Sequence, residues 1–220
     1  GGSGCGPGCV AWGADAMAAL QGLYRPRSVA EATALLAQDD TARLLAGGAT
    51  LVAMINARVI EPPALVSLAA IDELKGLAAL PDGRIRIGAF TRHCDTAACT
   101  LGLGAGAVVR DAASQIANAT VRNMGTIGGS IAFADPGLDY PPALVAADAQ
   151  VEIASTAGRR LVPAREFFVD WYATALAPGE MVTAVFLPAP LPRGVGVYIK
   201  HARVAGDYAT ASVAACGSVS

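Results

Sequence analysis

Residues 120–143 read TVRNMGTIGGSIAFADPGLDYPPA, and this stretch decides how the rest of the chain is interpreted. Its glycines, Gly125, Gly128 and Gly129, lose backbone entropy on folding and bring no side chain to pack. Short hydroxyl and carboxylate side chains follow at Thr126, Ser130, Asp135 and Asp139. Bare backbone N–H groups beside groups suited to ribose hydroxyls predict a seat for a nucleotide diphosphate. A glycine-rich surface turn is an equal alternative on these residues alone.

A second glycine-containing bend lies in residues 44–58, LLAGGATLVAMINAR. An apolar strand end leads through Gly47-Gly48 into residues with helical spacing, Leu51, Met54 and Ile55. A strand, a glycine pair and a helix start predict an anion-binding corner. The bend has neither the lysine of a P-loop nor the G-x-G-x-x-G of a Rossmann turn. Two such bends in one domain can hold one diphosphate from both sides.

These two stretches resemble the two flavin loops of the FAD-binding medium subunits of molybdenum hydroxylases. That family includes the flavoproteins of aerobic carbon monoxide dehydrogenase and of xanthine, nicotine and quinoline dehydrogenases. Two later stretches, FFVDWYATALAPGEMV (167–182) and IKHARVAGDYATAS (199–212), are similar to later family segments in the same order. The resemblance runs from about Tyr24 to the end, and four blocks in series are more specific than one glycine motif.

The resemblance implies an α+β fold, a two-lobed FAD-binding domain of the PCMH/vanillyl-alcohol-oxidase type. A small β-α-β lobe is expected over residues 20–75 and a larger lobe with an antiparallel sheet over residues 76–190. Residues 191–220 are expected to begin a truncated C-terminal domain. Residues 1–19, rich in glycine and small side chains, are expected to form a flexible tail.

The resemblance also implies which residues bind FAD. The first loop supplies Ala46, Gly47, Gly48, Ala49, Thr50 and Leu51, and the second supplies Thr126, Ile127, Gly128, Gly129 and Ser130. Asp139 is expected to take a polar end of the nucleotide, and Val182 is expected to line the pocket. Lys200 matches a lysine near the flavin, and Tyr208 matches a tyrosine beside the isoalloxazine ring. Without the resemblance, Tyr208 is better explained as an amphipathic anchor at a strand start. A β-branched residue at position 128 is expected to empty the site.

The function implied by the resemblance is electron transfer. In the family, a large molybdenum–pterin subunit oxidises the substrate, and electrons pass through a small [2Fe–2S] subunit to FAD, in what is expected to be a dimer of heterotrimers. They then leave to NAD+, a quinone or oxygen. No catalytic residue is predicted in this chain, because His93 and His201, its only histidines, are far apart in the sequence and have no nearby nucleophile. Each is expected to be a surface or partly buried residue. A stand-alone flavoenzyme of the same fold and a flavin-free scaffold subunit are the alternatives.

Composition narrows the class of protein further. The 220 residues are 54% hydrophobic with a net charge of −2, and no basic cluster points to a nucleic-acid partner. No membrane span or signal peptide is visible, so a cytoplasmic location is expected. The cysteines are Cys5, Cys9, Cys94, Cys99 and Cys216. Cys94 and Cys99 open a plant-type iron–sulfur motif that no third cysteine completes, and Cys5 with Cys9 is an incomplete metal site, so no metal is predicted here.

The pattern predicts the first elements in order. Ser28 and Glu31 form a capping box for a helix with one apolar face, which packs on strands at 43–45 and 64–68. A small β-α-β-α-β lobe ending near Leu74 follows from these elements. Residues 77–89 predict a hairpin turning at Pro81-Asp82-Gly83.

The later elements are less regular. Residues 102–107, GLGAGA, predict a loop before a helix at 108–118 that leads directly into the TIGGS turn. Pro141-Pro142 predicts a further helix start. Strands are expected at 150–154, 181–187 and 195–201, in one antiparallel sheet with one buried face. An edge strand at 213–219 is expected to lack its partners.

Overall fold

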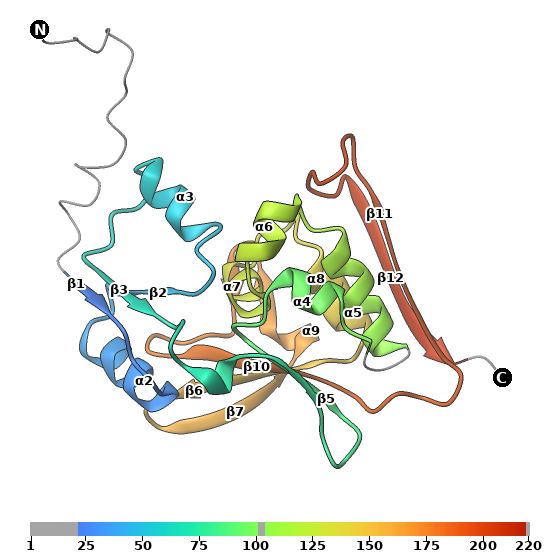
Figure 1. Cartoon of the computed structure of the whole chain (residues 1–220), viewed down its shortest axis with the longest axis horizontal. Coiled ribbons are helices and arrows are strands. Elements are labelled where there is room, and N and C mark those ends of the chain that lie inside the picture. Colours follow the sequence, from blue (N-terminus) through green and yellow to red (C-terminus); the bar gives the residue numbers. More distant parts are fainter. Residues whose placement is uncertain (1–21, 101–103, 219–220) are drawn as a thin grey trace, which may run out of the picture.

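The computed structural model describes residues 22–100 and 104–218 (Figure 1). The N-terminal part is a parallel sheet of order β1-β3-β2, formed by β1 (Gly22–Tyr24), β2 (Arg43–Leu45) and β3 (Ala64–Ser67). Helices α2 (Val29–Gln38) and α3 (Leu51–Asn56) connect these strands. The predicted β-α-β-α-β order is therefore confirmed.

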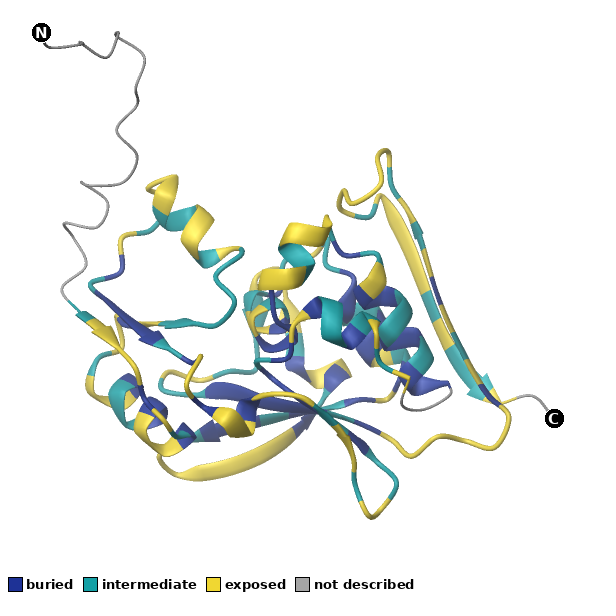
Figure 2. Cartoon of the chain, in the orientation of Figure 1, coloured by how far each residue is buried: buried dark blue, intermediate teal, exposed yellow. Residues whose placement is uncertain are grey.

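Helix α2 begins at the predicted capping box. Ser28 Oγ accepts a hydrogen bond from the Glu31 N–H at 3.1 Å, and Glu31 Oε2 accepts one from the Arg27 N–H at 2.8 Å. Val29 and Ala32 on its apolar face are buried. Helix α3, in contrast, has no buried residue although five of its six residues are apolar, and it stands apart from the other helices (Figure 2).

The larger sheet has five antiparallel strands in the order β4-β5-β10-β6-β7. These are β4 (Leu77–Ala79), β5 (Ile85–Gly88), β10 (Met181–Leu187), β6 (Gln150–Ser155) and β7 (Gly158–Pro163). The β4–β5 hairpin turns at Gly83, whose φ of 85° favours glycine, as the Pro-Asp-Gly sequence predicts. Every residue of the central strand β10 except Phe186 is buried (Figure 2). Sequence identified four of the five strands and missed β7.

Short helices make up most of the rest of the described structure. They are η1 (Asp72–Leu74), α4 (His93–Ala97), α5 (Ala105–Ser114), α6 (Ala119–Met124), α7 (Ile127–Phe133), α8 (Tyr140–Ala146) and α9 (Ala164–Phe167), with the small ladder β8 (Phe168–Asp170) and β9 (Ala173–Thr174) after them. Tyr140, Phe167, Ile131 and Leu144 supply large, fully buried side chains to the core. The helix predicted from Pro141-Pro142 is α8, with the prolines in its first turn.

The helix predicted at 108–118 is wrong in both boundaries. Helix α5 begins at Ala105, so residues 105–107 of GLGAGA are helical and the predicted loop is wrong there, while residues 101–103 lie outside the described ranges. It ends at Ser114 because Asn118 caps a new helix, its Oδ1 accepting from the Val121 N–H at 3.0 Å. Helix α6, which the pattern missed, therefore separates α5 from the second glycine bend.

The predicted TIGGS turn is the start of helix α7. Thr126 is its N-cap, and its Oγ1 accepts from the Gly129 N–H at 3.3 Å. Gly128 and Gly129 therefore lie in the first turn of this helix. The sequence did not predict a helix here because glycine disfavours helix interiors.

The strand predicted at 195–201 is present as β11 (Gly194–His201), but it does not join the five-stranded sheet. It pairs with β12 (Ala211–Ser218) in a long antiparallel hairpin that packs against α5 (Figure 1). Prolines at 188, 190 and 192 lead the chain out of β10, because proline cannot donate in a ladder. A Cβ on Gly196 would collide with Gly104 O, so this strand fits closely on the start of α5. The strand predicted at 213–219 is β12; the expectation that it lacks partners is wrong on its β11 side.

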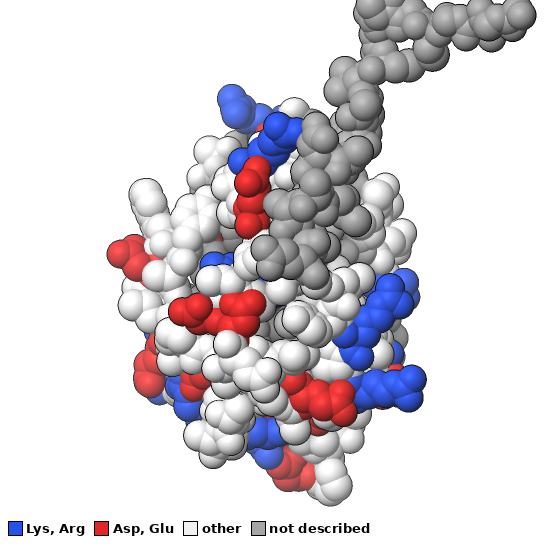
Figure 3. Space-filling view, turned by 90° about the vertical axis from the view of Figure 1, so that its left-hand side faces the viewer, with Lys and Arg blue, Asp and Glu red and all other residues white. Residues whose placement is uncertain are grey.

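No helix in the two described ranges has the length and apolarity needed to cross a bilayer. The face in Figure 3 carries acidic and basic side chains interspersed among uncharged ones. The predicted tail, with Cys5 and Cys9, lies outside the described residues. The domain boundaries stay predictions.

Candidate cofactor site

The two glycine bends meet in space, although about 75 residues separate them in the chain. A Cβ on Gly47 would collide with the carbonyl of Met124 and lie 3.0 Å from Gly125 Cα. The Cβ of Ala46 lies 3.7 Å from the position of a Cβ on Gly129. The backbone of one bend therefore rests directly on the backbone of the other.

Both bends line one cavity of about 690 Å³. It is lined by twelve of the predicted residues: Ala46, Gly47, Gly48, Ala49, Thr50, Leu51, Thr126, Gly129, Ser130, Asp139, Lys200 and Tyr208. Three other predicted residues do not line it. Val182 is buried in β10 opposite Ile153, and Ile127 and Gly128 are buried below the second bend.

The first bend presents a row of free backbone donors. Among the described residues, the N–H groups of residues 46–51 have no hydrogen-bond acceptor. Gly48 allows the bend through a φ of 77°, where other residues are strained. Consecutive free N–H groups in a turn form a concave anion-binding site, so this bend suits a diphosphate.

The second bend differs from the prediction, because several of its donors are already used. The Ile127 N–H donates to Thr91 O at 3.0 Å, and the Gly128 N–H donates to Ala89 O at 2.9 Å. A Cβ on Gly128 would lie 2.5 Å from Ala89 Cβ, so close packing on Ala89 explains this glycine. Gly129 is different: it is exposed, and it lines the cavity. Of the two glycines, only Gly129 fits the prediction that a missing side chain leaves room for a ligand.

Lys200 and Asp139 form a buried ion pair at the cavity. Lys200 Nζ lies 3.0 Å from Asp139 Oδ1 and also donates to Gln115 O at 3.2 Å. Tyr198 Oη donates to Asp139 Oδ1 at 2.6 Å, and burial, followed by this hydrogen bond, raises the pKa of Tyr198. The two residues predicted to bind separate parts of the nucleotide therefore bind each other. Any contact with a ligand must use the lone pairs and protons that this network leaves free.

His93 is buried at the cavity, whereas the sequence led us to expect a surface or partly buried residue. Its Nδ1 lies 3.1 Å from Tyr140 Oη, and the two rings pack with centroids 5.4 Å apart. Burial, with a smaller contribution from the charge of Arg122, lowers the pKa of His93 to about 4. The imidazole is therefore neutral at physiological pH. His201 is exposed, as expected.

Two tyrosines border the cavity from later loops. Tyr208 lies over Gly137, where a Cβ would be 2.8 Å from its Cδ1. It lies in the loop before β12, so the anchor at a strand start is not what the structure shows. Tyr172 was not predicted: its φ is 55°, its hydroxyl donates to Asp135 at 2.9 Å, and it lines the same cavity. It lies within the FFVDWYATALAPGEMV stretch, but no residue pattern distinguished it there.

Sequence reasoning also missed the apolar wall of the cavity, formed by Leu44, Met54, Ile60, Ile116, Val121, Phe133 and Leu138. Met54 belongs to the helical spacing that was recognised in the first bend. The predicted helix is present as α3, but a segment of six residues does not show in its sequence that its apolar side chains face a cavity and not the core.

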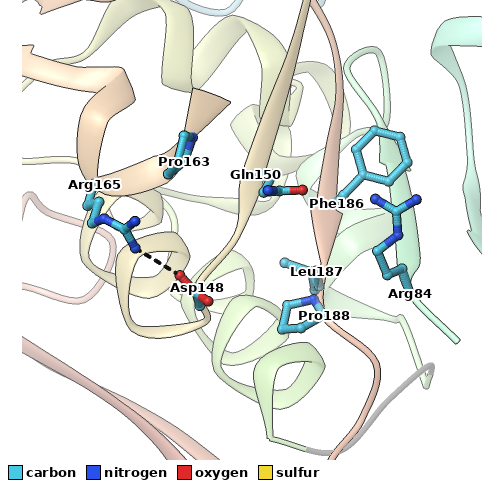
Figure 4. Close-up of a pocket in the computed structure, with 8 residues that line it drawn as sticks. All are labelled: Arg84, Asp148, Gln150, Pro163, Arg165, Phe186, Leu187 and Pro188. Carbon is cyan, nitrogen blue, oxygen red and sulfur yellow. Dashed lines mark hydrogen bonds and ion pairs between the residues drawn. The ribbon is translucent and has the colours of Figure 1, made fainter. Parts of the chain in front are cut away.

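A smaller cavity of about 280 Å³ lies at the end of β10 and contains neither bend (Figure 4). Its two cations have acidic partners: Arg165 pairs with Asp148 at 3.3 Å, and Arg84 pairs with Asp82 at 2.7 Å. The larger cavity is therefore the candidate site. No cluster of histidine, cysteine and carboxylate side chains in the described ranges is suited to a metal ion.

The residues of the larger cavity fit a flavin dinucleotide. They combine free N–H donors for a diphosphate with apolar and aromatic walls for planar rings, and with hydroxyl groups at Thr50, Thr126 and Ser130. A family model described as the FAD binding domain in molybdopterin dehydrogenase matches residues 17–190. The chain belongs to this family, as its resemblance to molybdenum hydroxylase flavoproteins predicted.

Individual relatives agree. The chain is 38% identical over 194 residues to the carbon monoxide dehydrogenase medium chain of Afipia carboxidovorans, covering 87% of this chain and 66% of that one. Its fold matches a subunit of reconstituted CO dehydrogenase from Oligotropha carboxidovorans with a TM-score of 0.84 and 36% identity, over 90% of this chain and 69% of that chain. For quinoline 2-oxidoreductase from Pseudomonas putida 86 the TM-score is 0.80 at 31% identity, over 89% of this chain and 67% of that chain. These matches confirm the predicted α+β fold, and the chain spans about two thirds of the length of such relatives.

Proposed function

We propose that this chain is the FAD-binding, electron-transferring part of a molybdenum-containing hydroxylase or dehydrogenase. The observation that carries the proposal is the meeting of two sequence-distant bends at one cavity, with the free N–H groups of residues 46–51 along one side. Relatives that align along most of the chain are medium subunits of such enzymes. When bound, FAD supplies one- and two-electron transfer.

The chain's own residues would bind and orient this group. The N–H groups of residues 46–51 would bind the diphosphate, with Gly129 leaving room on the opposite side. Tyr208 and Tyr172 would border the planar rings. The buried ion pair of Lys200 and Asp139 would hold β11 beside α8. The N–H dipoles of residues 46–51 are fixed in place, and such dipoles stabilise a bound charge without reorganising.

The partners follow from the proposed role. A large subunit with a molybdenum–pterin cofactor and a small [2Fe–2S] subunit would deliver electrons, in a dimer of heterotrimers, and NAD+, a quinone or oxygen would accept them. A cytoplasmic location is proposed, supported by the free thiols of Cys94, Cys99 and Cys216 in the described part.

Absorption spectroscopy of the purified chain tests the proposal. The expected result is a flavin spectrum, or its appearance when FAD is added, together with a rise in Tm that grows with FAD concentration. A colourless protein that does not bind added FAD would instead be a scaffold subunit. Expression with its genomic neighbours should yield a complex containing molybdenum and iron–sulfur clusters. Substrate turnover by the chain alone would favour a stand-alone flavoenzyme.

A further inference from the structure

His93 begins helix α4, and its imidazole is held tightly at the cavity. Its backbone N–H donates to Gly125 O at 3.0 Å, and its Nδ1 lies 3.1 Å from Tyr140 Oη. A Cβ on Gly125 would lie 2.5 Å from Nε2, so the ring occupies the space beside this glycine. The residue is 4% exposed, and what remains accessible lies at the cavity, which His93 lines.

The contact with Tyr140 determines which ring nitrogen carries the proton. Tyr140 is fully buried, and its hydroxyl interacts with His93 Nδ1 and with the side chain of Thr96. Burial raises the pKa of Tyr140, whereas the contact with Thr96 lowers it, so Thr96 is the donor in that contact. The phenol proton is left for His93 Nδ1, to which we assign the role of acceptor. In a neutral imidazole the other nitrogen then carries the hydrogen, and His93 presents an Nε2–H donor.

This donor has no partner within the described ranges. Nε2 forms no hydrogen bond with these residues. Every side-chain nitrogen or oxygen atom in the described ranges that is itself fully buried has a partner, so Nε2 must be partly accessible. Nε2 is therefore not sealed in the protein but reaches the cavity. The neighbouring polar groups are engaged, because Asp139 is bonded to Lys200 and Tyr198. A nearly buried donor without a partner is costly, and a ligand acceptor would remove that cost.

We propose that His93 is a further cofactor-binding residue whose Nε2–H donates a hydrogen bond to an oxygen or ring-nitrogen acceptor of FAD. This inference rests on the proposed FAD function. Because the imidazole is neutral, the contact is a directional hydrogen bond and adds no charge to the site. Tyr140 is then a positioning residue, since its hydroxyl holds the imidazole in the tautomer that donates.

Titration of the full chain with FAD tests the contact, with His93→Leu, His93→Gln and His201→Gln as the variants. His93→Leu removes the donor, and we expect the Kd for FAD to rise about tenfold, the loss of one hydrogen bond. His93→Gln keeps an N–H donor and should stay within about threefold of the wild type. His201→Gln changes the exposed histidine and should have no effect. Equal Kd values for wild type and His93→Leu would overturn the inference.

Nitrogen-15 NMR of the wild-type protein provides a readout that does not depend on folding of a variant. Without FAD, the His93 side chain should show the neutral Nε2–H tautomer. Addition of FAD should shift the Nε2 resonance, because that nitrogen gains an acceptor, and should shift Nδ1 much less. An unshifted Nε2 in FAD-saturated protein would reject the contact while leaving the proposed function intact. Failure of the wild type to bind FAD would reject both.

Discussion

Lys200 and Asp139 lie 61 positions apart in the chain, and their side chains form an ion pair that is almost fully buried. The Nζ–Oδ1 distance is 3.0 Å, and the two side chains are 5% and 6% exposed. The pair joins β11 to the residue that precedes α8. It therefore attaches the C-terminal hairpin to the helices around the cavity, and both residues line that cavity.

Breaking this pair from one side should be costly. Lys200→Met leaves the Asp139 carboxylate buried with Tyr198 as its remaining side-chain donor, and we expect a loss of about 3 kcal/mol in the free energy of unfolding. Urea denaturation of the apo protein measures it. The double variant Lys200→Met/Asp139→Asn removes both charges and should recover part of the loss. A single variant within about 0.5 kcal/mol of wild type would show that the pair contributes little.

The two neighbouring glycines of α7 should respond differently to alanine. Gly128→Ala places a methyl group 2.5 Å from Ala89 Cβ and 2.7 Å from Ala89 O, so we expect about 1–3 kcal/mol of destabilisation. Gly129→Ala meets Thr126 Oγ1 at 3.1 Å and faces the cavity, so stability should change by less than about 1 kcal/mol. Its FAD affinity should fall by about tenfold or more. Urea denaturation and FAD titration of both variants separate packing from binding, and equal behaviour would contradict the distinction. If the expected result is obtained, a β-branched residue at position 128 would empty the site by disturbing the packing around Ala89, not by blocking FAD.

Acid should weaken the fold through His93. Its pKa is about 4 in the folded protein and near 6.5 when unfolded, so between these values the unfolded state binds more protons. The stability that depends on neutral His93 is therefore fully present above about pH 6.5. It is lost as the pH falls toward 4, which lowers the free energy of unfolding by about 3 kcal/mol in all. Carboxylates with lowered pKa values add their own loss at the acid end. His93→Gln is the control: the difference in unfolding free energy between wild type and variant should shrink from pH 7 to pH 4, and a constant difference would contradict the mechanism.

Tyr172 should contribute more to binding than to folding. Its side chain is exposed and its φ of 55° is unfavourable, so Tyr172→Gly relieves about 1 kcal/mol of backbone strain while losing the contact with Asp135. We expect apo stability to change by less than about 1 kcal/mol and the Kd for FAD to rise severalfold because the aromatic wall is removed. Tyr172→Phe keeps the ring and should bind FAD nearly as wild type. Wild-type affinity in Tyr172→Gly would exclude a role of this ring in the site.

The glycine bends illustrate how far sequence reasoning reached at the site. The bare glycines drew attention to Gly48 and Gly129, which line the cavity, and their role in binding stays a prediction. The same argument misread Gly128, because a missing side chain is equally needed where another part of the protein approaches, here Ala89. Sequence spacing does not distinguish a ligand from a neighbouring backbone. Resemblance added Asp139, Lys200 and Tyr208, but it gave no sign that the first two bind each other.

Local chemistry in the sequence alone determined the elements whose signals act over a few residues: the Ser28 capping box, the Pro81-Asp82-Gly83 turn, the prolines that start α8 and the run of apolar residues in β10. It also determined the family, because four matching stretches in order exceed chance. Only the tertiary structure decided that β11 leaves the main sheet, that Gly47 rests on Met124, and that His93 and Tyr172 face the cavity. These facts depend on contacts between residues far apart in the chain, and such contacts are set by shape and packing in three dimensions, which no local pattern encodes.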